Sequence, residues 1–460
     1  MENATIVALA TSPTPAGIAV IRVSGPKTKL ALKAIFSGKK DPTKFPRTLV
    51  FGDILDFKTG GPIDKGLAVF MPAPWSFTGE DVGEFQFHGS PLLVQQVLRS
   101  LYAYGIAPAA AGEFTRRAFL NGKLDLAQAE AIADVINAKS DEALRFAGEQ
   151  LKGRLSSAVS AIGEPLRDLL AELEASIDFP DEDIQPKKLG EISRGVREAR
   201  EKIFKLVETY SFGQVVREGI RVLLCGQPNA GKSSLLNLLL GRRRAIVSDI
   251  PGTTRDLLEE EATIAGYKFI FCDSAGIRET NDEVERIGVE LAIERLGWAD
   301  IVIIVVDATD KSDVWRKTVD IVKEKAKNIW MVTNKIDVNP QALSQFFCDS
   351  SMCQQNFYIS AKTGAGIGAL LEALVEDIAK HVPDKGEAGE VVTNERHRDC
   401  LQRAYASLSA FVDLFEQGNP PLEILSADLR DALGALDEIV GKTFTEDILG
   451  RIFSKFCVGK

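Results

Sequence analysis

The octapeptide Gly-Gln-Pro-Asn-Ala-Gly-Lys-Ser at residues 226–233 constrains the fold of this chain more than any other stretch. It follows an apolar run at 221–225 and precedes a leucine-rich run at 234–240. A strand, a Gly-rich loop and a helix in this order form a phosphate-binding loop, in which backbone N–H groups and the positive end of the helix face a phosphate. The sequence therefore predicts a nucleotide site at the end of a buried strand.

The individual positions of this loop predict which atoms meet the nucleotide. The Lys232 ammonium is expected to reach the β- and γ-phosphates, and the Ser233 hydroxyl is expected to ligate Mg²⁺. Loops of this kind serve ATP and GTP alike, so the choice of base must come from elsewhere in the chain. The loop residues that we assign to nucleotide binding are Asn229, Ala230, Gly231, Lys232, Ser233 and Ser234.

Two short motifs downstream predict guanine as the base. The first, Asn334-Lys335-Ile-Asp337, follows an apolar run that ends at residue 333. The Asp337 carboxylate can accept hydrogen bonds from the guanine N1–H and from its exocyclic amine, a pair of donors that adenine does not offer. The second motif follows the next apolar run, where a backbone N–H can donate to guanine O6, and it consists of Ser360, Ala361 and Lys362.

Two further motifs are expected to surround the γ-phosphate and Mg²⁺. Asp273-Ser274-Ala275-Gly276 ends a third apolar run, which places the Asp273 carboxylate and the Gly276 amide near the metal and the phosphate. Thr254, in the Gly-Thr-Thr-Arg-Asp stretch at 252–256, is the expected second hydroxyl ligand of Mg²⁺. Each short motif alone is weak evidence. All five elements, in this order and at strand ends, predict a domain that binds and hydrolyses GTP.

Hydrolysis in this domain requires an unusual solution. Ile277 stands where Ras-like GTPases have the glutamine that orients the attacking water, so hydrolysis is either very slow or depends on other groups. Asn229 can hold a monovalent cation against the phosphates, and this cation would supply the charge of an arginine finger. Glu285 can orient water through a bridging water. A solvated carboxylate favoured by a helix dipole is the alternative for Glu285, and the residues alone leave both open.

The periodicity of apolar residues predicts α/β and all-helical parts. Residues 217–378 alternate strand-like runs with helical patterns, which predicts a largely parallel, doubly wound sheet. Upstream, we expect strands at 5–10, 17–23, 66–70 and 82–87, and a helix at 91–103. Apolar residues at spacings of three and four predict helices at 151–177, 192–207 and within 392–455. Pro165 should bend the first of these helices or start a new one.

These patterns predict a multidomain chain of α/β and all-α parts, with the doubly wound α/β domain inserted into a helical domain. The expected segments are an N-terminal α/β domain at 1–120, a first helical part at 121–215, the inserted GTPase domain at 216–379, and a second helical part at 380–460.

Charge and hydropathy limit the partners and the location. The net charge of −10 counts against tight nonspecific binding of nucleic acid, although it does not exclude a local basic patch. No run approaches the roughly 18 apolar residues that a membrane span needs. The first 22 residues lack the pattern of a secretory signal and are poor in arginine. We therefore expect a cytoplasmic protein.

Several motifs across the whole chain resemble the tRNA-modification GTPase family MnmE, also called TrmE. Besides the GTPase motifs, they are Thr-Ile-Val-Ala-Leu-Ala at 5–10, Phe-Thr-Gly-Glu-Asp at 77–81, Gly-Glu-Phe-Thr-Arg-Arg-Ala-Phe-Leu-Asn at 112–121, Lys-Leu-Asp-Leu-Ala-Gln-Ala-Glu at 123–130, and Phe-Cys-Val-Gly-Lys at 456–460. The third GTPase motif reads Asp-Ser-Ala-Gly, where the family usually has Thr in the second place.

The resemblance implies an N-terminal α/β folate-binding domain that forms a homodimer, with a site for a 5-formyl- or methylene-tetrahydrofolate derivative. It also implies a heterotetramer with the FAD-dependent protein MnmG, and modification of C5 of the wobble uridine in certain tRNAs. Potassium-stimulated hydrolysis, in which G domains dimerise across the nucleotide, is the family's answer to the missing glutamine.

The resemblance also assigns roles to individual residues. Side-chain oxygens of Asn229 and Thr253, and backbone carbonyls of Ser248 and Ile250, correspond to the family's K⁺ ligands. Ser248, Thr253 and Thr254 would also line the GTP site. Glu285 matches the family's water-orienting glutamate, which favours the catalytic role over the solvated one.

Two further assignments lie outside the GTPase motifs. The positions that match the folate site are Arg22, Glu84, Lys123 and Lys460; without the resemblance each would be read as a surface charge. Glu80, which lies one motif earlier, is the alternative to Glu84. Cys457 matches a cysteine that is regarded as part of the modification site. A helix-end thiol that packs against its own domain is the alternative.

The G motifs alone also fit a regulatory GTPase that acts in ribosome assembly or signalling. The acidic composition, the folate-like domain and Cys457 favour the modification enzyme. An ion-transport G protein is disfavoured because no membrane span is expected.

Overall fold

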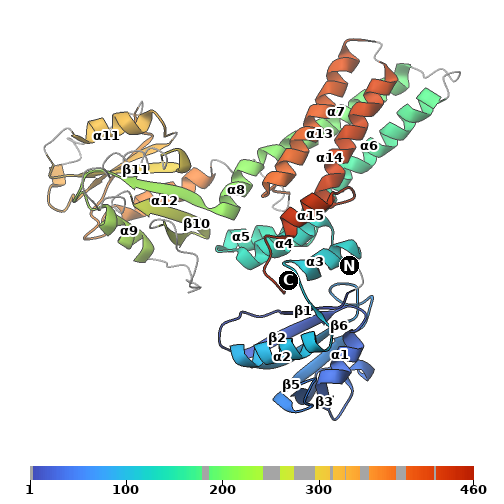
Figure 1. Ribbon diagram of the computed structural model, residues 1–460. Coiled ribbons are helices and arrows are strands. Elements are labelled where there is room, and N and C mark those ends of the chain that lie inside the picture. The colour runs from blue at the N-terminus through green and yellow to red at the C-terminus, as the bar shows by residue number, and fades with distance from the viewer. Residues whose placement is uncertain are drawn as a thin grey trace, which may run out of the picture. The chain divides into compact units, whose positions relative to one another are not determined.

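The computed structural model describes residues 4–178, 186–241, 259–273, 296–310, 314–326, 328–341, 352–379, 390–418 and 421–459. These residues form two compact units (Figure 1). The first contains Met1–Ala133, Gln150–Pro180 and Pro421–Lys460, and the second contains Asp134–Glu149 and Asp181–Pro420. Each unit therefore combines segments that are distant in the sequence.

The first unit is built on a seven-stranded sheet. The strand order is β3 (Phe36–Gly38), β4 (Val50–Leu55), β5 (Pro62–Met71), β6 (Val82–Gly89), β2 (Ala16–Ser24), β1 (Ile6–Leu9) and β7 (Ala107–Pro108). All neighbours are antiparallel except β1 and β7. The four strands predicted in this region and the helix at 91–103 are present, whereas the short strands β3, β4 and β7 were not predicted.

The two faces of this sheet have different coverings because side chains alternate along each strand. Helices α1 (Thr28–Ile35) and α2 (Pro91–Ala103) cover one face, where they bury apolar residues of β1, β2, β5 and β6. On the other face, Phe114 of α3 (Glu113–Leu120) packs with Ile6, Ala8 and Ala109. Arg22 and Glu84 alternate with core residues and therefore belong to this second face.

Helices complete the first unit. They are α4 (Leu126–Asn137), which begins here, α6 (Arg154–Asp178), α14 (Leu422–Val440) and α15 (Glu446–Phe453). Helix α6 runs through Pro165 without a break, so of the two expected outcomes, a bend or a new helix, the second is wrong. A proline inside a helix costs about 3 kcal/mol. Apolar residues buried along α6, among them Val159, Ile162 and Leu166, and the packing of α6 along α14 offset this cost.

The second unit contains a six-stranded sheet. Its order is β13 (Gln355–Tyr358), β12 (Ile329–Asn334), β11 (Ile301–Asp307), β8 (Ile220–Cys225), β10 (Tyr267–Asp273) and β9 (Glu259–Ile264). All pairs are parallel except β9 with β10. This confirms the predicted doubly wound sheet; the antiparallel edge strand β9 was not predicted.

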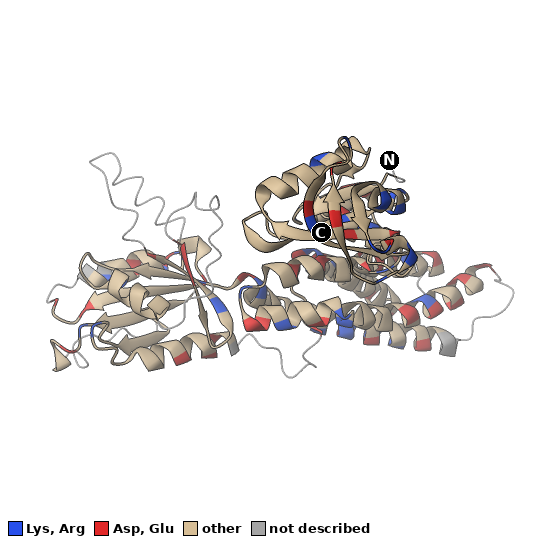
Figure 2. Ribbon diagram, turned by 90° about the horizontal axis from the view of Figure 1, so that it is seen from below, with Lys and Arg blue, Asp and Glu red and all other residues tan. Residues whose placement is uncertain are grey.

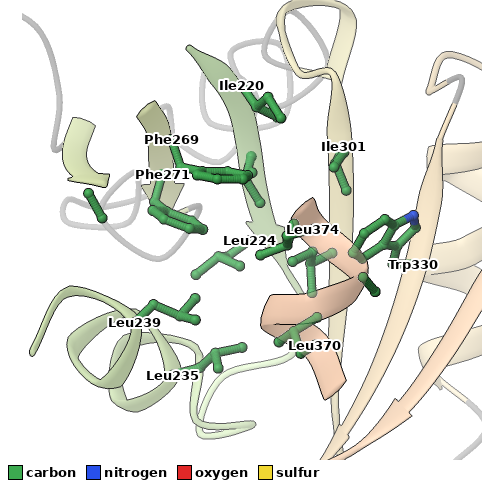
Figure 3. Close-up of a cluster of buried hydrophobic side chains, with 14 of the residues drawn as sticks. Ile220, Leu224, Leu235, Leu239, Phe269, Phe271, Ile301, Trp330, Leu370 and Leu374 are labelled. Carbon is green, nitrogen blue, oxygen red and sulfur yellow. The ribbon is translucent and has the colours of Figure 1, made fainter. Parts of the chain in front are cut away.

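Both faces of this sheet are buried, as a doubly wound fold requires. Helices α9 (Lys232–Gly241) and α12 (Ile367–Ala379) cover one face, and Figure 3 shows their leucines packed against the strand residues Leu224, Phe271 and Trp330. Helix α11 (Val314–Lys323) covers the other through Trp315 and Val319. Parallel strands thus end together at one edge of the sheet, where the described residues of the predicted nucleotide motifs lie.

Four further helices belong wholly or mostly to the second unit: α5 (Asp141–Leu151), α7 (Pro186–Glu208), α8 (Tyr210–Glu218) and α13 (Glu395–Glu416). Helices α7 and α13 pack against each other. Phe146 of α5 meets Phe212 of α8 edge to face at 5.7 Å. No helix in the described part of the chain is long and apolar enough to cross a membrane.

Candidate functional site

The loop that follows β8 is shaped by three residues with left-handed backbone. Gly226, Asn229 and Gly231 have φ values of 137°, 64° and 92°. A side chain at Gly226 is excluded, because its Cβ would lie 2.2 Å from the Val305 carbonyl oxygen. The loop therefore turns sharply between the buried strand and α9, which begins at Lys232.

Two side chains at the start of α9 are fixed by hydrogen bonds. The buried Lys232 ammonium donates to the carbonyl oxygens of Gly226 and Gln227, both at 2.9 Å. The Ser233 hydroxyl donates to Asp273 Oδ2 at the end of β10, at 2.8 Å. A hydroxyl beside a carboxylate is an all-oxygen donor set, which Mg²⁺ prefers together with phosphate oxygens. The two residues therefore fit a magnesium site next to the phosphate loop.

Asn334, at the end of β12, joins three separate loops. Its Nδ2 donates to the Ala230 carbonyl at 2.9 Å, and its Oδ1 accepts from the backbone N–H groups of Lys335 at 2.8 Å and Ala361 at 2.9 Å. Only 2% of Asn334 is exposed. This side chain thus ties the phosphate loop to both predicted guanine motifs.

Asp337 and Lys335 have different surroundings. The Ser360 hydroxyl donates to Asp337 Oδ1 at 2.6 Å, which fixes the plane of an exposed carboxylate. The Lys335 ammonium donates to Asp307 Oδ2 at 2.5 Å, and the Thr309 hydroxyl donates to Asp307 Oδ1. Burial alone would raise the pKa of Asp307, but the hydrogen bonds from Lys335 and Thr309 outweigh it and hold this pKa below its ordinary value.

Several predicted site residues lie outside the described residues. They are Ser248, Ile250, Thr253, Thr254, Ser274, Ala275, Gly276, Glu285 and Lys460. The described residues of the predicted GTP site gather at the carboxyl edge of the six-stranded sheet, on or directly after β8, β10, β12 and β13.

The predicted folate residues lie on the second face of the seven-stranded sheet. Arg22 and Glu84 are opposite each other on β2 and β6, and Arg22 Nε donates to Glu84 Oε1 at 2.9 Å. The Arg22 guanidinium lies 5.7 Å from the Phe77 ring centre and 5.9 Å from that of Phe114. A charged donor, a carboxylate and two aromatic rings suit a flat heterocycle with polar edges, so these residues fit a pterin.

Lys123 and Cys457 complete the described part of this region. The Lys123 ammonium lies 5.6 Å from the ring centre of Trp75. Cys457 is exposed and free, while the backbone on either side of it is docked. Val458 forms an antiparallel bridge with Ala111, and a Cβ on Gly459 would lie 2.0 Å from the Leu9 carbonyl oxygen. The tail therefore packs against the end of β1 and leaves the thiol accessible.

Sequence reasoning missed some residues that shape these sites. Asp307, which holds Lys335, could have been found because it ends the apolar run of β11 as Asp273 ends that of β10. Glu80, the alternative to Glu84 for the folate site, accepts hydrogen bonds from Ser24 and Arg117 and not from Arg22. No spacing rule in the sequence connects Glu80 with Ser24 and Arg117.

A doubly wound sheet that carries a phosphate loop, a buried Asn334 brace and an exposed Asp337 at one edge defines a P-loop GTPase. Family models extend this class to the whole chain: the model described as "GTP-binding protein TrmE N-terminus" matches residues 5–123, and the model of the MnmE helical domain matches residues 126–457. The chain belongs to the MnmE family of tRNA modification GTPases.

Two bacterial relatives agree with this assignment. The tRNA modification GTPase MnmE of Geobacter sulfurreducens is 40% identical over 456 residues, with 99% of both chains covered. That of Geobacter metallireducens is 41% identical over 457 residues, again with 99% of both covered. The crystal structure of the G domain of the T. maritima FeoB iron transporter is 26% identical, covers 35% of this chain and 98% of its own, and has a TM-score of 0.26. The predicted family, fold class and GTPase activity are confirmed by the family models and relatives.

Proposed function

We propose that the GTPase cycle of this chain drives the modification of C5 of the wobble uridine in certain tRNAs, together with a folate one-carbon unit and an FAD-dependent partner of the MnmG kind. One observation carries the proposal: the tail with the exposed Cys457 docks beside β1, where Ala8 pairs with Arg22 of the candidate folate site. Cys457 and Arg22 belong to the first unit, whereas the residues of the GTP site belong to the second.

In the GTP site, we propose that Lys232 neutralises the phosphates, while Ser233 and Asp273, with Thr254, hold Mg²⁺. Ser234, Ser274, Ala275 and Lys362 would line the nucleotide, as the motifs imply. The support for Lys232 is its buried ammonium, which two loop carbonyls hold over the phosphate loop.

Hydrolysis is proposed to depend on K⁺ and on a second G domain. Asn229 has a left-handed backbone in the phosphate loop, and its amide oxygen would share the cation with Ser248, Ile250 and Thr253. The cation would lie against phosphate charge that develops in the transition state, where electrostatic stabilisation is most effective. Glu285 would orient the attacking water, because the apolar Ile277 cannot.

In the first unit, Arg22, Glu84, Lys123 and Lys460 are proposed to hold the tetrahydrofolate derivative. Glu84 would accept from the donor edge of the pterin, and the cationic groups would bind its oxygen or the glutamate-tail carboxylates. When bound, this cofactor would supply the one-carbon unit. The positions of Arg22 and Glu84, paired across two strands beside Phe77, support this assignment.

The proposal includes a homodimer through the N-terminal domain, a heterotetramer with the MnmG-type partner, a cytoplasmic location, and the segments 1–120, 121–215, 216–379 and 380–460 as functional domains. The match of one family model to residues 5–123 supports the first of these boundaries.

Mass spectrometry of tRNA nucleosides tests this function. Cells that lack the gene should contain unmodified wobble uridine, and the wild-type gene should restore the modification. Normal modification together with defective ribosomal particles would favour the alternative, a regulatory GTPase in ribosome assembly.

GTP turnover in potassium and sodium salts tests the cation. Turnover of the wild type should rise strongly when K⁺ replaces Na⁺. Asn229→Gly should lose this difference, since glycine keeps the left-handed backbone and removes only the amide. Equal turnover of the wild type in the two salts would rule out the role of Asn229.

A further inference from the structure

A basic segment stands out in a chain whose net charge is −10. Residues 27–47 contain seven basic residues and one acidic residue, Asp41. They form α1, which covers one face of the seven-stranded sheet, the edge strand β3, and the short helix η1 (Pro42–Lys44). On the long helices, basic and acidic residues are interspersed, and Figure 2 shows them as blue and red segments along each helix.

Part of this segment carries charge that carboxylates do not neutralise. Lys29 pairs with Asp81 at 3.4 Å and Lys33 pairs with Asp41 at 3.8 Å. Lys39, Lys40 and Lys44 are exposed, and none of them forms an ion pair with a carboxylate in the described part of the chain.

Exposed aromatic rings lie among these cations. The Lys40 ammonium is 5.0 Å from the ring centre of Phe45, which is 43% exposed. Two residues on, the Arg47 guanidinium donates to the Trp75 carbonyl. The Trp75 ring is 72% exposed, and the Lys123 ammonium lies against it. The segment 39–47 carries Lys39, Lys40, Lys44, Phe45 and Arg47 on exposed positions, and the bond from Arg47 brings Trp75 to its end. We call these six residues the basic–aromatic surface.

We propose that the basic–aromatic surface binds the anticodon region of the tRNA, with Lys39, Lys40 and Lys44 on backbone phosphates and an unpaired base stacked on Trp75. The inference rests on the proposed function, in which a tRNA is the substrate, and it names the part of this chain that holds it.

Three features favour single-stranded RNA as the occupant. Unneutralised lysines attract phosphates, and they do so locally although the whole chain is acidic. Exposed rings flanked by cations are typical platforms for unstacked bases, which double-stranded RNA does not present. Finally, Lys123, one of the proposed folate residues, lies 5.6 Å from the ring centre of Trp75, so a nucleotide held on Trp75 would stand next to that residue.

Fluorescence anisotropy with the full chain tests the proposal. The probes are an anticodon stem-loop RNA with uridine at the wobble position, and the same strand annealed into a continuous duplex. The variants are Trp75→Ala, Trp75→Phe, and the triple replacement of Lys39, Lys40 and Lys44 by Gln. Matched controls are Phe204→Ala, another exposed ring, and Gln at the exposed Lys202, Lys323 and Lys325.

The triple variant should bind the stem-loop more weakly, and its slope of log Kd against log salt should fall by about 2, at about 0.7 per phosphate contact. Trp75→Ala should weaken binding of the stem-loop by about 5- to 150-fold, as expected for a lost base–aromatic stack. It should leave duplex binding nearly unchanged, and Trp75→Phe should retain most of the affinity. The controls should match the wild type, and all variants should keep wild-type GTP turnover.

Other results would overturn the inference. The inference is overturned if the triple variant binds the stem-loop with wild-type affinity and salt slope. It is also overturned if the variants bind RNA normally but self-associate more weakly in ultracentrifugation, because the surface would then be a contact between two copies of the chain. If the wild type modifies tRNA in cells but these variants bind RNA normally, only the inference fails. If the wild-type gene does not restore modification to cells that lack it, the proposed function fails.

Discussion

The Asn334 brace allows a quantitative prediction. Replacing Asn334 with Ala removes three hydrogen bonds, one donated to Ala230 and two accepted from the backbone of Lys335 and Ala361. The loss of each hydrogen bond lowers the free energy of unfolding by about 1 kcal/mol net, and by up to about 3 kcal/mol where the partner that remains is buried without a hydrogen bond. The free energy of unfolding of this sheet should therefore fall by about 3 kcal/mol or more, even without nucleotide.

Removal of the three Asn334 hydrogen bonds should also weaken nucleotide binding. The three loops that Asn334 joins would have to be ordered by the nucleotide itself, which costs binding up to about 3 kcal/mol, or roughly 100-fold in Kd. Titration with a fluorescent GDP analogue measures this change. Urea denaturation followed by tryptophan fluorescence measures the stability, since Trp298, Trp315 and Trp330 belong to this domain.

Two further variants distinguish the loss of the Asn334 hydrogen bonds from a nonspecific loss of stability. Asn334→Asp keeps the acceptor Oδ1 but places a buried carboxylate oxygen against the Ala230 carbonyl, so its effect should be at least as large as that of Ala. Asn339→Ala removes a single bond, from Nδ2 to the Ala308 carbonyl at 2.7 Å, and should cost about 1 kcal/mol. The reasoning is refuted if Asn334→Ala unfolds at the wild-type urea concentration without nucleotide, or if its Kd rises less than threefold.

Three other predictions follow from the contacts described above. Because the pKa of Asp307 is lowered in the folded protein, the stability that its carboxylate contributes is fully present above pH 3.8 and is lost as the pH falls through the lower folded pKa. Below pH 4, Asp307→Asn should therefore lose less stability in an acid titration than the wild type, and equal curves of stability against pH would contradict this. Gly459→Ala should displace the tail, because its Cβ would meet the Leu9 carbonyl at a φ of 101°. Faster backbone hydrogen exchange in residues 456–459 would report this, and an unchanged exchange rate would argue against docking. Cys457→Ser should keep GTP turnover but abolish tRNA modification, and full modification by that variant would remove the thiol from the mechanism.

The doubly wound sheet was predictable because local patterns specify it. Buried parallel strands such as β11 and β12 are continuous apolar runs, and the guanine motif that begins at Asn334 stands at the end of the second run. The edge strand β9, Glu259–Ile264, escaped prediction because it begins with three glutamates and is held by pairing with β10. This segment is a strand because it pairs with β10, and its own composition does not favour a strand.

Tertiary contacts account for the other differences. Pro165 stays inside α6 because packing along α14 outweighs a local preference. The Arg22–Glu84 pair joins residues 62 positions apart, through a register that no short pattern encodes. The resemblance to a family supplied these positions, and physical reasoning from single residues would have left them as surface charges.

The docked tail has a consequence for synthesis of the chain. The ribosome makes β1 long before it makes Val458 and Gly459, which pack against Ala111 and beside Leu9. Domains generally fold as units during synthesis, in order from the N-terminal side. The sheet that contains β1 therefore waits for the synthesis of residues 458–459, after the whole GTPase sheet has been made, before the contacts at the end of β1 are complete.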